Sequence, residues 1–303
     1  MPTEKIEILS VNLLDHHRQL VEDLKRFAKS LRLEFGWHYL LDITWILQNL
    51  GSPNGLAIMD AGAGVGLMQW YLADQGAKVY SVDRTSRQAL PLRYRTHFTV
   101  RGMRTDDLST SSEVIAMRFN RSKGLSKLAS PLREIADSIG NSNSSGCVII
   151  YNQDLANLVD IPDNSLDAIV AVSALEHNTP DGLSEIVNEM LRTLKPDGHL
   201  IATLAATRDQ DWWHEESKAW CYTDESLRNI FDLSSSTPSN YDNYDELFAT
   251  LQDCAELRDN LASFYYKSPD NGMPWGVWNP KYQPVGICKR KSKYEPNFTK
   301  VEN

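Results

Sequence analysis

The apolar residues of the first 54 positions recur at the spacing of amphipathic helices. Between residues 20 and 31 the apolar side chains lie three or four positions apart, so they share one face of a helix. A second stretch of this kind covers residues 37–47, and it is followed by Gly51 and Pro53, which commonly end a helix. We therefore expect residues 1–54 to form N-terminal helices.

From residue 55 onward, short apolar runs alternate with helical patterns. Runs that are apolar throughout are typical of parallel strands, which helices cover on both faces. The expected strands are residues 56–59, 78–83, 147–151, 166–172 and 200–206, and the expected helices between them are residues 67–75 and 183–194. This alternation predicts an α/β fold with a doubly wound, mostly parallel sheet.

Two regions interrupt the alternation. Residues 84–146, after strand 2, are longer than one crossover helix requires, so they must contain an insertion. Residues 207–303 form an aromatic-rich C-terminal region, in which residues 285–288 are one more short apolar run. We expect residues 1–303 to be a single domain with residues 55–83 and 147–206 as its core.

Composition narrows the class of protein. The net charge of −9 argues against sequence-independent nucleic-acid binding, which needs a basic surface. No apolar run approaches the roughly 18 residues of a membrane span, and the first residues lack the pattern of a signal peptide. We therefore expect a cytoplasmic protein without a membrane span. The four cysteines form no CxxC pair, so we expect no metal.

A glycine-rich loop directly follows the first expected strand of the core. Glycine allows a positive φ angle and lets a ligand approach the backbone closely. Dinucleotide-binding loops follow G-x-G-x-x-G, but this chain has Leu67 in the place of the third glycine. An acidic residue at the start suits a cofactor with an ammonium group and no phosphate. The loop consists of Asp60, Ala61, Gly62, Ala63, Gly64, Val65 and Gly66.

The acidic residues at this loop could bind the cofactor or could have only a structural role. Asp83 ends the second expected strand, where a carboxylate can accept hydrogen bonds from both ribose hydroxyls of an adenosine. It could instead cap the turn that follows. Asp60 could contact the amino end of the cofactor or only orient the loop backbone.

The ordered set of segments resembles the class I S-adenosylmethionine-dependent methyltransferases. The resemblance covers about residues 55–83 and 147–206 and implies S-adenosyl-L-methionine as the cofactor. It also implies that Asp154 accepts from the adenine amino group, that Leu155 packs on the adenine ring, and that residues 173–177 face the methionine moiety. The cofactor-binding residues are then Asp60, Ala61, Gly62, Ala63, Gly64, Gly66, Asp83, Arg84, Asp154, Leu155 and Ser173.

His177 and Glu176 are the catalytic candidates. They follow the fourth strand of the core, at the edge where ligands gather in open α/β sheets. A neutral imidazole of His177 could take a proton from an attacking hydroxyl or amine, or it could hydrogen-bond the next helix. Glu176 could help to position the cofactor.

The two irregular regions supply the substrate candidates. Eleven basic residues lie between Arg84 and Arg133 against three acidic ones, so we predict that Arg93, Arg95 and Arg101 bind an anionic group of the substrate. Residues 93–101 could form either a strand or a helix, and their arginines could instead serve structure. In the C-terminal region, Trp212, Trp213 and His214 are expected to cap the substrate.

The expected reaction is methyl transfer to a small molecule or glycan precursor, possibly anionic. A NAD-dependent oxidoreductase is the rival enzyme, and a methyltransferase-like binding subunit without catalysis is the rival that is not an enzyme. The sequence determines neither the acceptor atom nor the oligomeric state, and a homo-oligomer is possible.

Overall fold

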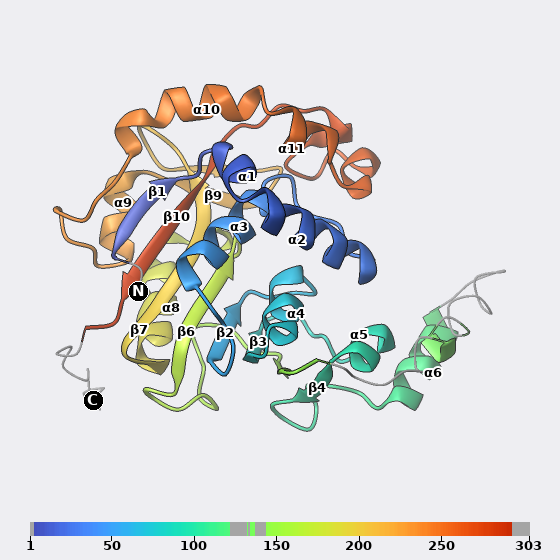
Figure 1. The fold of residues 1–303 in the computed structure, drawn as a ribbon. Coiled ribbons are helices and arrows are strands. Elements are labelled where there is room, and N and C mark those ends of the chain that lie inside the picture. Colours follow the sequence, from blue (N-terminus) through green and yellow to red (C-terminus); the bar gives the residue numbers. More distant parts are fainter. Residues whose placement is uncertain (1–2, 122–131, 133, 137–143, 293–303) are drawn as a thin grey trace.

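One large sheet organises the molecule, and its strands come from every part of the chain. The computed structural model describes residues 3–121, 132, 134–136 and 144–292. The strands are β1 (Lys5–Ile8), β2 (Ala57–Ala61), β3 (Lys78–Val82), β4 (Thr99–Gly102), β5 (Cys147–Tyr151), β6 (Leu166–Val172), β7 (Leu194–Ala206), β8 (Trp212–His214), β9 (Ala219–Tyr222) and β10 (Gln283–Arg290). They lie in the order β1-β10-β7-β6-β2-β3-β5-β4, and the β8–β9 hairpin joins β7 through β9 (Figure 1).

Helices precede, connect and follow the strands. The α-helices are α1 (Asn12–His16), α2 (Arg18–Ser30), α3 (Tyr39–Leu50), α4 (Leu67–Asp74), α5 (Leu92–His97), α6 (Ser111–Arg121), α8 (Pro180–Thr193), α9 (Asp224–Ile230), α10 (Tyr244–Gln252) and α11 (Ala255–Asp259). Short 3-10 turns are η1 (Leu175–His177), η2 (Tyr241–Asn243), η3 (Ser263–Lys267) and η4 (Pro274–Gly276).

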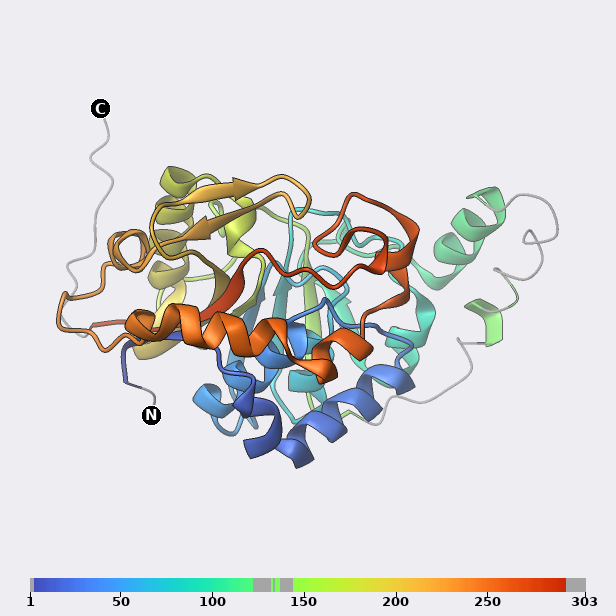
Figure 2. The same cartoon turned by 90° about the horizontal axis from the view of Figure 1, so that it is seen from above.

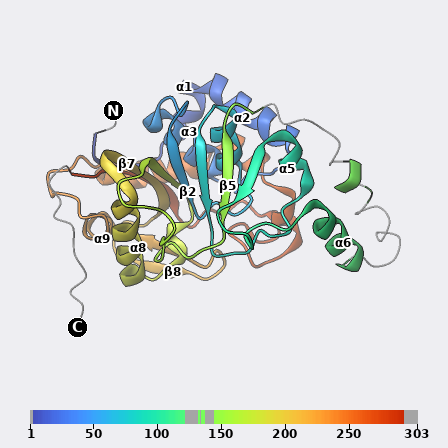
Figure 3. The same ribbon diagram turned by 90° about the horizontal axis from the view of Figure 1, so that it is seen from below.

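The sheet separates two hydrophobic cores. Successive residues of a strand point to opposite faces, so Ile58 joins the core under α2, α3 and α4 while Met59 joins the core under α8 and α9. Figure 3 shows α1 to α3 on one side of the sheet and α8 and α9 on the other. The prediction of a doubly wound, mostly parallel sheet is confirmed, because the pairs among β2, β3, β5, β6 and β7 are parallel.

The two ends of the chain add strands of opposite direction. β10 covers the short run predicted at 285–288 and pairs antiparallel with β7. β1 pairs antiparallel with β10, so the expectation of helices alone for residues 1–54 was wrong at residues 5–8. β7 begins at Leu194 rather than at the predicted Leu200.

The insertion extends the sheet and then leaves it. The segment for which strand and helix were both open contains one of each, since α5 is followed by β4 parallel to β5. Figures 1 and 2 both show α6 standing away from the body of the molecule. The insertion's basic residues Lys123, Lys127 and Arg133 lie outside the described residues.

Chain direction brings four separate segments to the carboxyl edge of the parallel strands. η1 follows β6, and the β8–β9 hairpin follows β7. α3 precedes β2 and therefore runs opposite to the strands, so its first residues lie at this edge. β10 starts with Gln283 opposite Ala206, the last residue of β7. Figure 2 shows the β8–β9 hairpin apart from α10, with C-terminal loops between them.

Candidate functional site

The glycine loop makes a close turn between β2 and α4. Gly62 has φ 73° and Gly64 has φ 48°, a backbone region that favours glycine. A Cβ atom on Gly62 would lie 2.4 Å from the Cβ of Ala174, so the loop also packs closely against the end of β6. Gln69, in the first turn of α4, donates to the carbonyls of Ala63 (3.2 Å) and Gly66 (3.2 Å). The loop is therefore held in shape by its own helix.

Asp83 ties the loop to the end of β3. Its Oδ2 accepts from the backbone N–H of Gly64 at 2.8 Å, and its Oδ1 accepts from the N–H of Thr85 at 2.7 Å. A carboxylate oxygen has two lone pairs, so both oxygens keep an acceptor position for a ligand. The turn-capping role and the ribose-binding role that the sequence left as alternatives are thus compatible.

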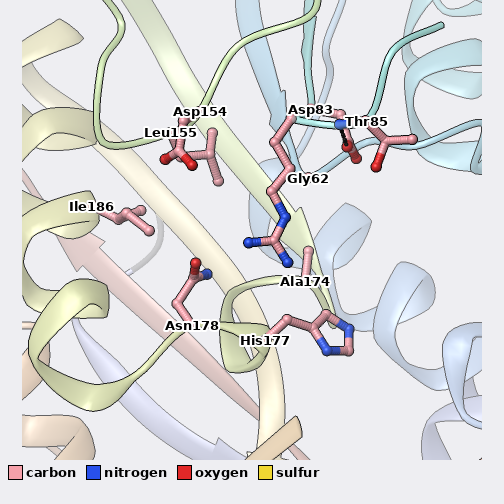
Figure 4. Close-up of a pocket in the computed structure, with 10 residues that line it drawn as sticks. Gly62, Asp83, Thr85, Asp154, Leu155, Ala174, His177, Asn178 and Ile186 are labelled. Atoms are coloured by element: carbon pink, nitrogen blue, oxygen red, sulfur yellow. Dashed lines mark hydrogen bonds between the residues drawn. The ribbon is translucent and has the colours of Figure 1, made fainter. Parts of the chain in front are cut away.

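A cavity opens beside this loop at the carboxyl edge. Its volume is about 190 Å³, and it lies between the ends of β2, β3, β5 and β6 and the start of α8 (Figure 4). Five predicted cofactor residues line it, together with the catalytic candidate His177. The lining is Gly62, Asp83, Arg84, Thr85, Asp154, Leu155, Ala174, His177, Asn178 and Ile186.

The other predicted cofactor residues do not line this cavity. Asp60 is buried, and burial raises the pKa of its carboxyl to about 7, opposed by the positive charge of Arg87 and a backbone hydrogen bond from Gln69. Arg87 donates to the carbonyls of Ser81 and Tyr151, each at 2.8 Å. Asp60 therefore does not line the cavity. Ala61, Ala63, Gly64, Gly66 and Ser173 likewise do not line the cavity.

Asp154 and Leu155 form one side of the cavity after β5. Asp154 is exposed, and its Oδ1 accepts from the N–H of Ala156 at 2.9 Å. Leu155 is buried against the core that α8 covers. An exposed carboxylate beside a fixed apolar side chain has the chemistry to bind a base edge and a ring face, as the resemblance implied.

The segment after β6 carries both catalytic candidates, and they point to different places. His177 is exposed, lines the cavity, and bonds through Nδ1 to the carbonyl of Lys218 at 2.7 Å (Figure 4). This bond makes Nδ1 the donor in the neutral ring and leaves Nε2 basic. Ser173 has φ 45°, and its hydroxyl donates to Oε1 of Glu176. Glu176 is only 1% exposed, and its Oε2 has no hydrogen-bond partner among the described residues.

Glu176 faces a group of buried aromatic and titratable side chains. Burial raises the pKa of its carboxyl, and the neighbouring positive charges of His177 and His38 oppose that shift. Its charge in turn helps to raise the pKa of Tyr39 and Tyr282, for which burial is the larger cause. A buried carboxylate oxygen without a partner is costly, so Oε2 of Glu176 is suited to accept a hydrogen bond from a ligand.

Three buried residues near this group, His38, Asp42 and Tyr282, were not among the candidates from the sequence. His38 is buried, and its Nδ1 lies 2.7 Å from Oδ2 of Asp42, which is 0% exposed. The ring of Tyr282 lies 5.8 Å from that of His38 and 5.4 Å from that of His214. The sequence could have indicated the His38–Asp42 pair, because the histidine stands four residues before the aspartate at the start of an apolar helix.

The aromatic residues of the β8–β9 hairpin lie at the same edge but do not line the cavity. β9 pairs with the last two residues of β7, so the hairpin stands at the carboxyl end of that strand. Trp213 is 37% exposed and its ring packs on Trp220 at 5.9 Å. Trp212 packs against His214, whose pKa is lowered by burial.

The structure does not bring Arg93, Arg95 or Arg101 into the cavity. The guanidinium of Arg93 lies 4.6 Å from the ring centroid of Tyr94. Arg95 donates to the carbonyls of Ser109 (2.5 Å) and Gln88 (3.3 Å), and Arg101 lies exposed on β4. The substrate role of these three residues stays a prediction.

No group of three or more His, Cys, Asp or Glu side chains that could hold a metal ion occurs in the described part of the chain. The four cysteines are free thiols. Among the helices that the structure describes, none is long and apolar enough to cross a membrane.

Comparison with known proteins gives a family model and a set of similar structures. Residues 119–202 match a model described as a methyltransferase domain. No curated protein sequence matches the chain.

Three similar solved structures are methyltransferases. A 1,6-didemethyltoxoflavin-N1-methyltransferase from Burkholderia thailandensis, solved with S-adenosylhomocysteine, has 14% identity and a TM-score of 0.44, with 92% of this chain and 89% of that chain covered. The magnesium protoporphyrin IX methyltransferase from Synechocystis PCC 6803, solved with S-adenosylmethionine, has 19% identity, 71% and 66% coverage and a TM-score of 0.34. A methyltransferase from Aquifex aeolicus that depends on the same cofactor has 16% identity, 70% and 86% coverage and a TM-score of 0.37.

The matched family model begins within the insertion and reaches into β7, while the glycine loop and Asp83 add the cofactor-binding elements before it. Together with the mostly parallel sheet, they make the chain similar to the class I S-adenosylmethionine-dependent methyltransferases.

Proposed function

We propose that the enzyme transfers the methyl group of S-adenosylmethionine to a small-molecule or glycan-precursor acceptor at the carboxyl edge of its sheet. The observation that carries the proposal is the cavity in which Gly62, Asp83, Asp154, Leu155 and His177 meet. When bound, S-adenosylmethionine supplies an electrophilic methyl group on a sulfonium, whose thioether is already a good leaving group. The protein's part is to align the acceptor with that methyl group and to exclude water.

The proposed cofactor contacts follow from the lining. Asp83 would accept hydrogen bonds from the ribose hydroxyls, Asp154 would accept from the adenine amino group, and Leu155 would cover the ring. Arg84, exposed at the rim, is the remaining predicted cofactor residue in the lining. In this proposal Ala61, Ala63 and Gly66 act through the shape of the loop.

The proposed acceptor site lies on the far side of η1 from the glycine loop. Nε2 of His177 is the proposed general base when the acceptor carries a proton at neutral pH. Glu176, whose Oε2 has no partner among the described residues, would accept a hydrogen bond from the acceptor. Trp212, Trp213 and His214 of the hairpin would line this space on one side. Tyr282, just before β10, would line it on another.

Two measurements test the proposal. Calorimetry should detect binding of S-adenosylhomocysteine and tighter binding of it than of NAD, and the opposite order would support an oxidoreductase. Incubation with S-adenosylmethionine labelled in its methyl group and deproteinised cell extract should then label one compound class. Cofactor binding without any labelled product would instead support a binding subunit without catalysis.

The acceptor side can be tested with the labelled compound. His177→Ala should lower kcat by about 10²–10⁴-fold, the usual contribution of a general base, with the Kd for S-adenosylhomocysteine nearly unchanged. Trp213→Ala should raise KM for the acceptor, whereas the matched variant Trp275→Ala, at an exposed tryptophan outside the hairpin, should not. Equal effects of the two tryptophan variants would remove the hairpin from the acceptor site.

A further inference from the structure

Two buried carboxylates near η1 have oxygen atoms that the protein leaves without a donor. Glu176 accepts the hydroxyl of Ser173 on Oε1, but its buried Oε2 has no partner among the described residues. Oδ1 of Asp42, in the first turn of α3, is buried without a partner in the same part of the chain. Most buried polar atoms of folded proteins are paired, so these oxygens point to a ligand that brings hydrogen-bond donors.

His38 and Tyr39 lie between these two carboxylates. Nδ1 of His38 is 2.7 Å from Oδ2 of Asp42, and the rings of His38 and Tyr39 are 5.4 Å apart. Burial raises the pKa of Tyr39, and the negative charges of Glu176 and Asp42 raise it further. α3 packs on β6, the strand before η1. The four side chains, which we call the Glu176 cluster, are therefore neighbours where α3 begins and η1 follows β6.

The hydrogen-bonding groups of the Glu176 cluster are mainly acceptors. Asp42 takes the Nδ1–H of His38, so Nε2 of the neutral ring is an acceptor. An ionised carboxylate offers only acceptors, and the hydroxyl of Tyr39 can accept as well as donate. In the part of the chain that the structure describes, no lysine or arginine forms an ion pair with Glu176 or Asp42. The cluster thus favours a ligand with several donors and a positive charge.

Aromatic rings lie beside the cluster. The ring of Trp37 is 4.4 Å from that of His38 and 5.4 Å from that of Tyr282, and the ring of Tyr282 is 5.8 Å from that of His38. The faces of aromatic rings attract ammonium groups. A buried carboxylate among aromatic rings therefore has the chemistry to bind an amine.

We propose that the methyl acceptor is an amine, whose N–H groups donate to Oε2 of Glu176 and to the hydroxyl of Tyr39. The inference rests on the proposed function and names the atom that receives the methyl group. A neutral primary amine has two donors for these two acceptors and a lone pair for the attack. A hydroxyl has one donor and would leave one of the two acceptors unmatched.

The bond changes are those of nitrogen methylation. The amine arrives as an ammonium group and gives one proton to Nε2 of His177, the proposed general base. Its lone pair then forms the bond to the methyl carbon while the bond between that carbon and sulfur breaks. The products are a methylated ammonium and S-adenosylhomocysteine, and the Asp42–His38 pair positions the cluster without taking part.

Calorimetry with benzylamine, benzyl alcohol and benzoate tests the recognition. The three probes share one ring and differ in their head group, and each is titrated into the full chain saturated with S-adenosylhomocysteine. Benzylamine should bind at one site per chain and about 10-fold more tightly than the other two, as expected for one hydrogen bond to a charged group. Failure of benzylamine to bind, or binding of the alcohol or of benzoate as tight as that of the amine, would overturn the proposal.

Glu176→Gln and Tyr39→Phe each remove one proposed contact. Both should weaken benzylamine binding, Glu176→Gln by about 10-fold, with the Kd for S-adenosylhomocysteine near wild type. Because Glu176→Gln removes a buried charge, its melting temperature should hold or rise. The matched variants Glu185→Gln and Tyr266→Phe, at exposed positions, should bind benzylamine as wild type does. Unchanged benzylamine affinity in either cluster variant would refute the proposed contacts.

The product of the transfer assay distinguishes this inference from the proposed function. The NMR chemical shift of the labelled methyl carbon shows which atom carries it, and we expect nitrogen. A methyl group on oxygen or carbon would overturn the amine acceptor and leave methyl transfer standing. Preferential binding of benzylamine without any labelled product would instead refute methyl transfer and support the amine site.

Discussion

The carboxylate of Asp83 joins the glycine loop to β3 through Gly64 and supports the next turn through Thr85. Because these bonds leave each oxygen one acceptor position, Asp83→Ala should remove loop support and ligand contacts together. We expect it to weaken S-adenosylhomocysteine binding by about 1.5–3 kcal/mol, the typical value for hydrogen bonds to a charged group.

Asp83→Asn refines this test. Its amide oxygen can still accept from Gly64, so the loop should keep its shape while only part of the ribose contact is lost. Calorimetry should rank affinity as wild type, then Asn, then Ala, with the exposed Asp106→Ala as a control at wild-type affinity. A folded Ala variant with an unchanged Kd would reduce Asp83 to a turn residue.

Asp60 predicts a dependence of stability on pH. Its pKa is about 7 in the folded protein and roughly 3.9 in an unfolded chain. Between these values the folded state binds more protons, so this residue's contribution to the free energy of unfolding is present below pH 4 and is lost as pH rises through 7. Asp60→Asn should remove about 2–4 kcal/mol of that pH dependence.

Urea unfolding at pH 5 and pH 8 measures this effect. Wild type and Asp60→Asn share all other titrating groups, so the change in their stability difference between the two pH values isolates Asp60. If the difference is the same at both pH values, Asp60 titrates normally and its burial has no electrostatic consequence.

The positions of four predicted cofactor residues that line the cavity are fixed by neighbouring strand ends. Asp83 ends a predicted parallel strand, and Gly62, Asp154 and Leu155 each follow one. Such strands end at one edge of the sheet. Asn178 and Ile186 were not predicted, because their positions depend on the packing of η1 and α8 rather than on strand order. Thr85, in the turn after β3, was not predicted either.

At the scale of elements, the start of α3 depends on the His38–Asp42 pair. Removing one member leaves the other buried without its partner, which typically costs about 3–5 kcal/mol. We expect His38→Leu alone to destabilise the protein by that amount. The double variant with Asp42→Leu should recover most of the loss, because no buried charge remains.

A double-mutant cycle by urea unfolding gives the coupling between these two residues. The conservative variant Asp42→Asn keeps an acceptor for the Nδ1–H of His38 and should lie between wild type and His38→Leu. Additive losses in the cycle would mean that the two side chains are neighbours without an energetic link.

Element prediction succeeded where the pattern was long or apolar throughout. β5 and β6 are buried along nearly their whole length, and α2 presents one apolar face. β1 alternates over only four residues and β8 covers three, lengths at which the pattern of a strand cannot be told from that of a loop. Their existence depends on partners far along the chain.

At the scale of the whole molecule, Arg104 joins the insertion to the body by an ion pair with Asp160, in addition to the pairing of β4 with β5. The contacts of Arg95 to the carbonyls of Ser109 and Gln88 lie within the insertion, so Arg95 holds the insertion together from inside. Arg95→Glu should therefore lower the melting temperature while the Kd for S-adenosylhomocysteine stays near wild type.

Arg101→Glu is the control for Arg95→Glu, because it reverses the charge of an exposed arginine of the same insertion. It should leave the melting temperature unchanged. Once an acceptor is identified, its KM distinguishes the two roles. A strongly raised KM in Arg95→Glu at wild-type thermal stability would restore the predicted role in binding an anionic substrate.

The pairing of β1 with β10 has a consequence for synthesis. Lys5 lies opposite Cys288, so β1 leaves the ribosome long before its partner strand. Until β10 arrives, Ile6 and Ile8, which end up fully covered, have no sheet to join, and an unpaired strand edge invites association with other chains. β1 should therefore stay unpaired until β10 has been synthesised. A chaperone that binds short apolar strands should raise the yield of folded enzyme.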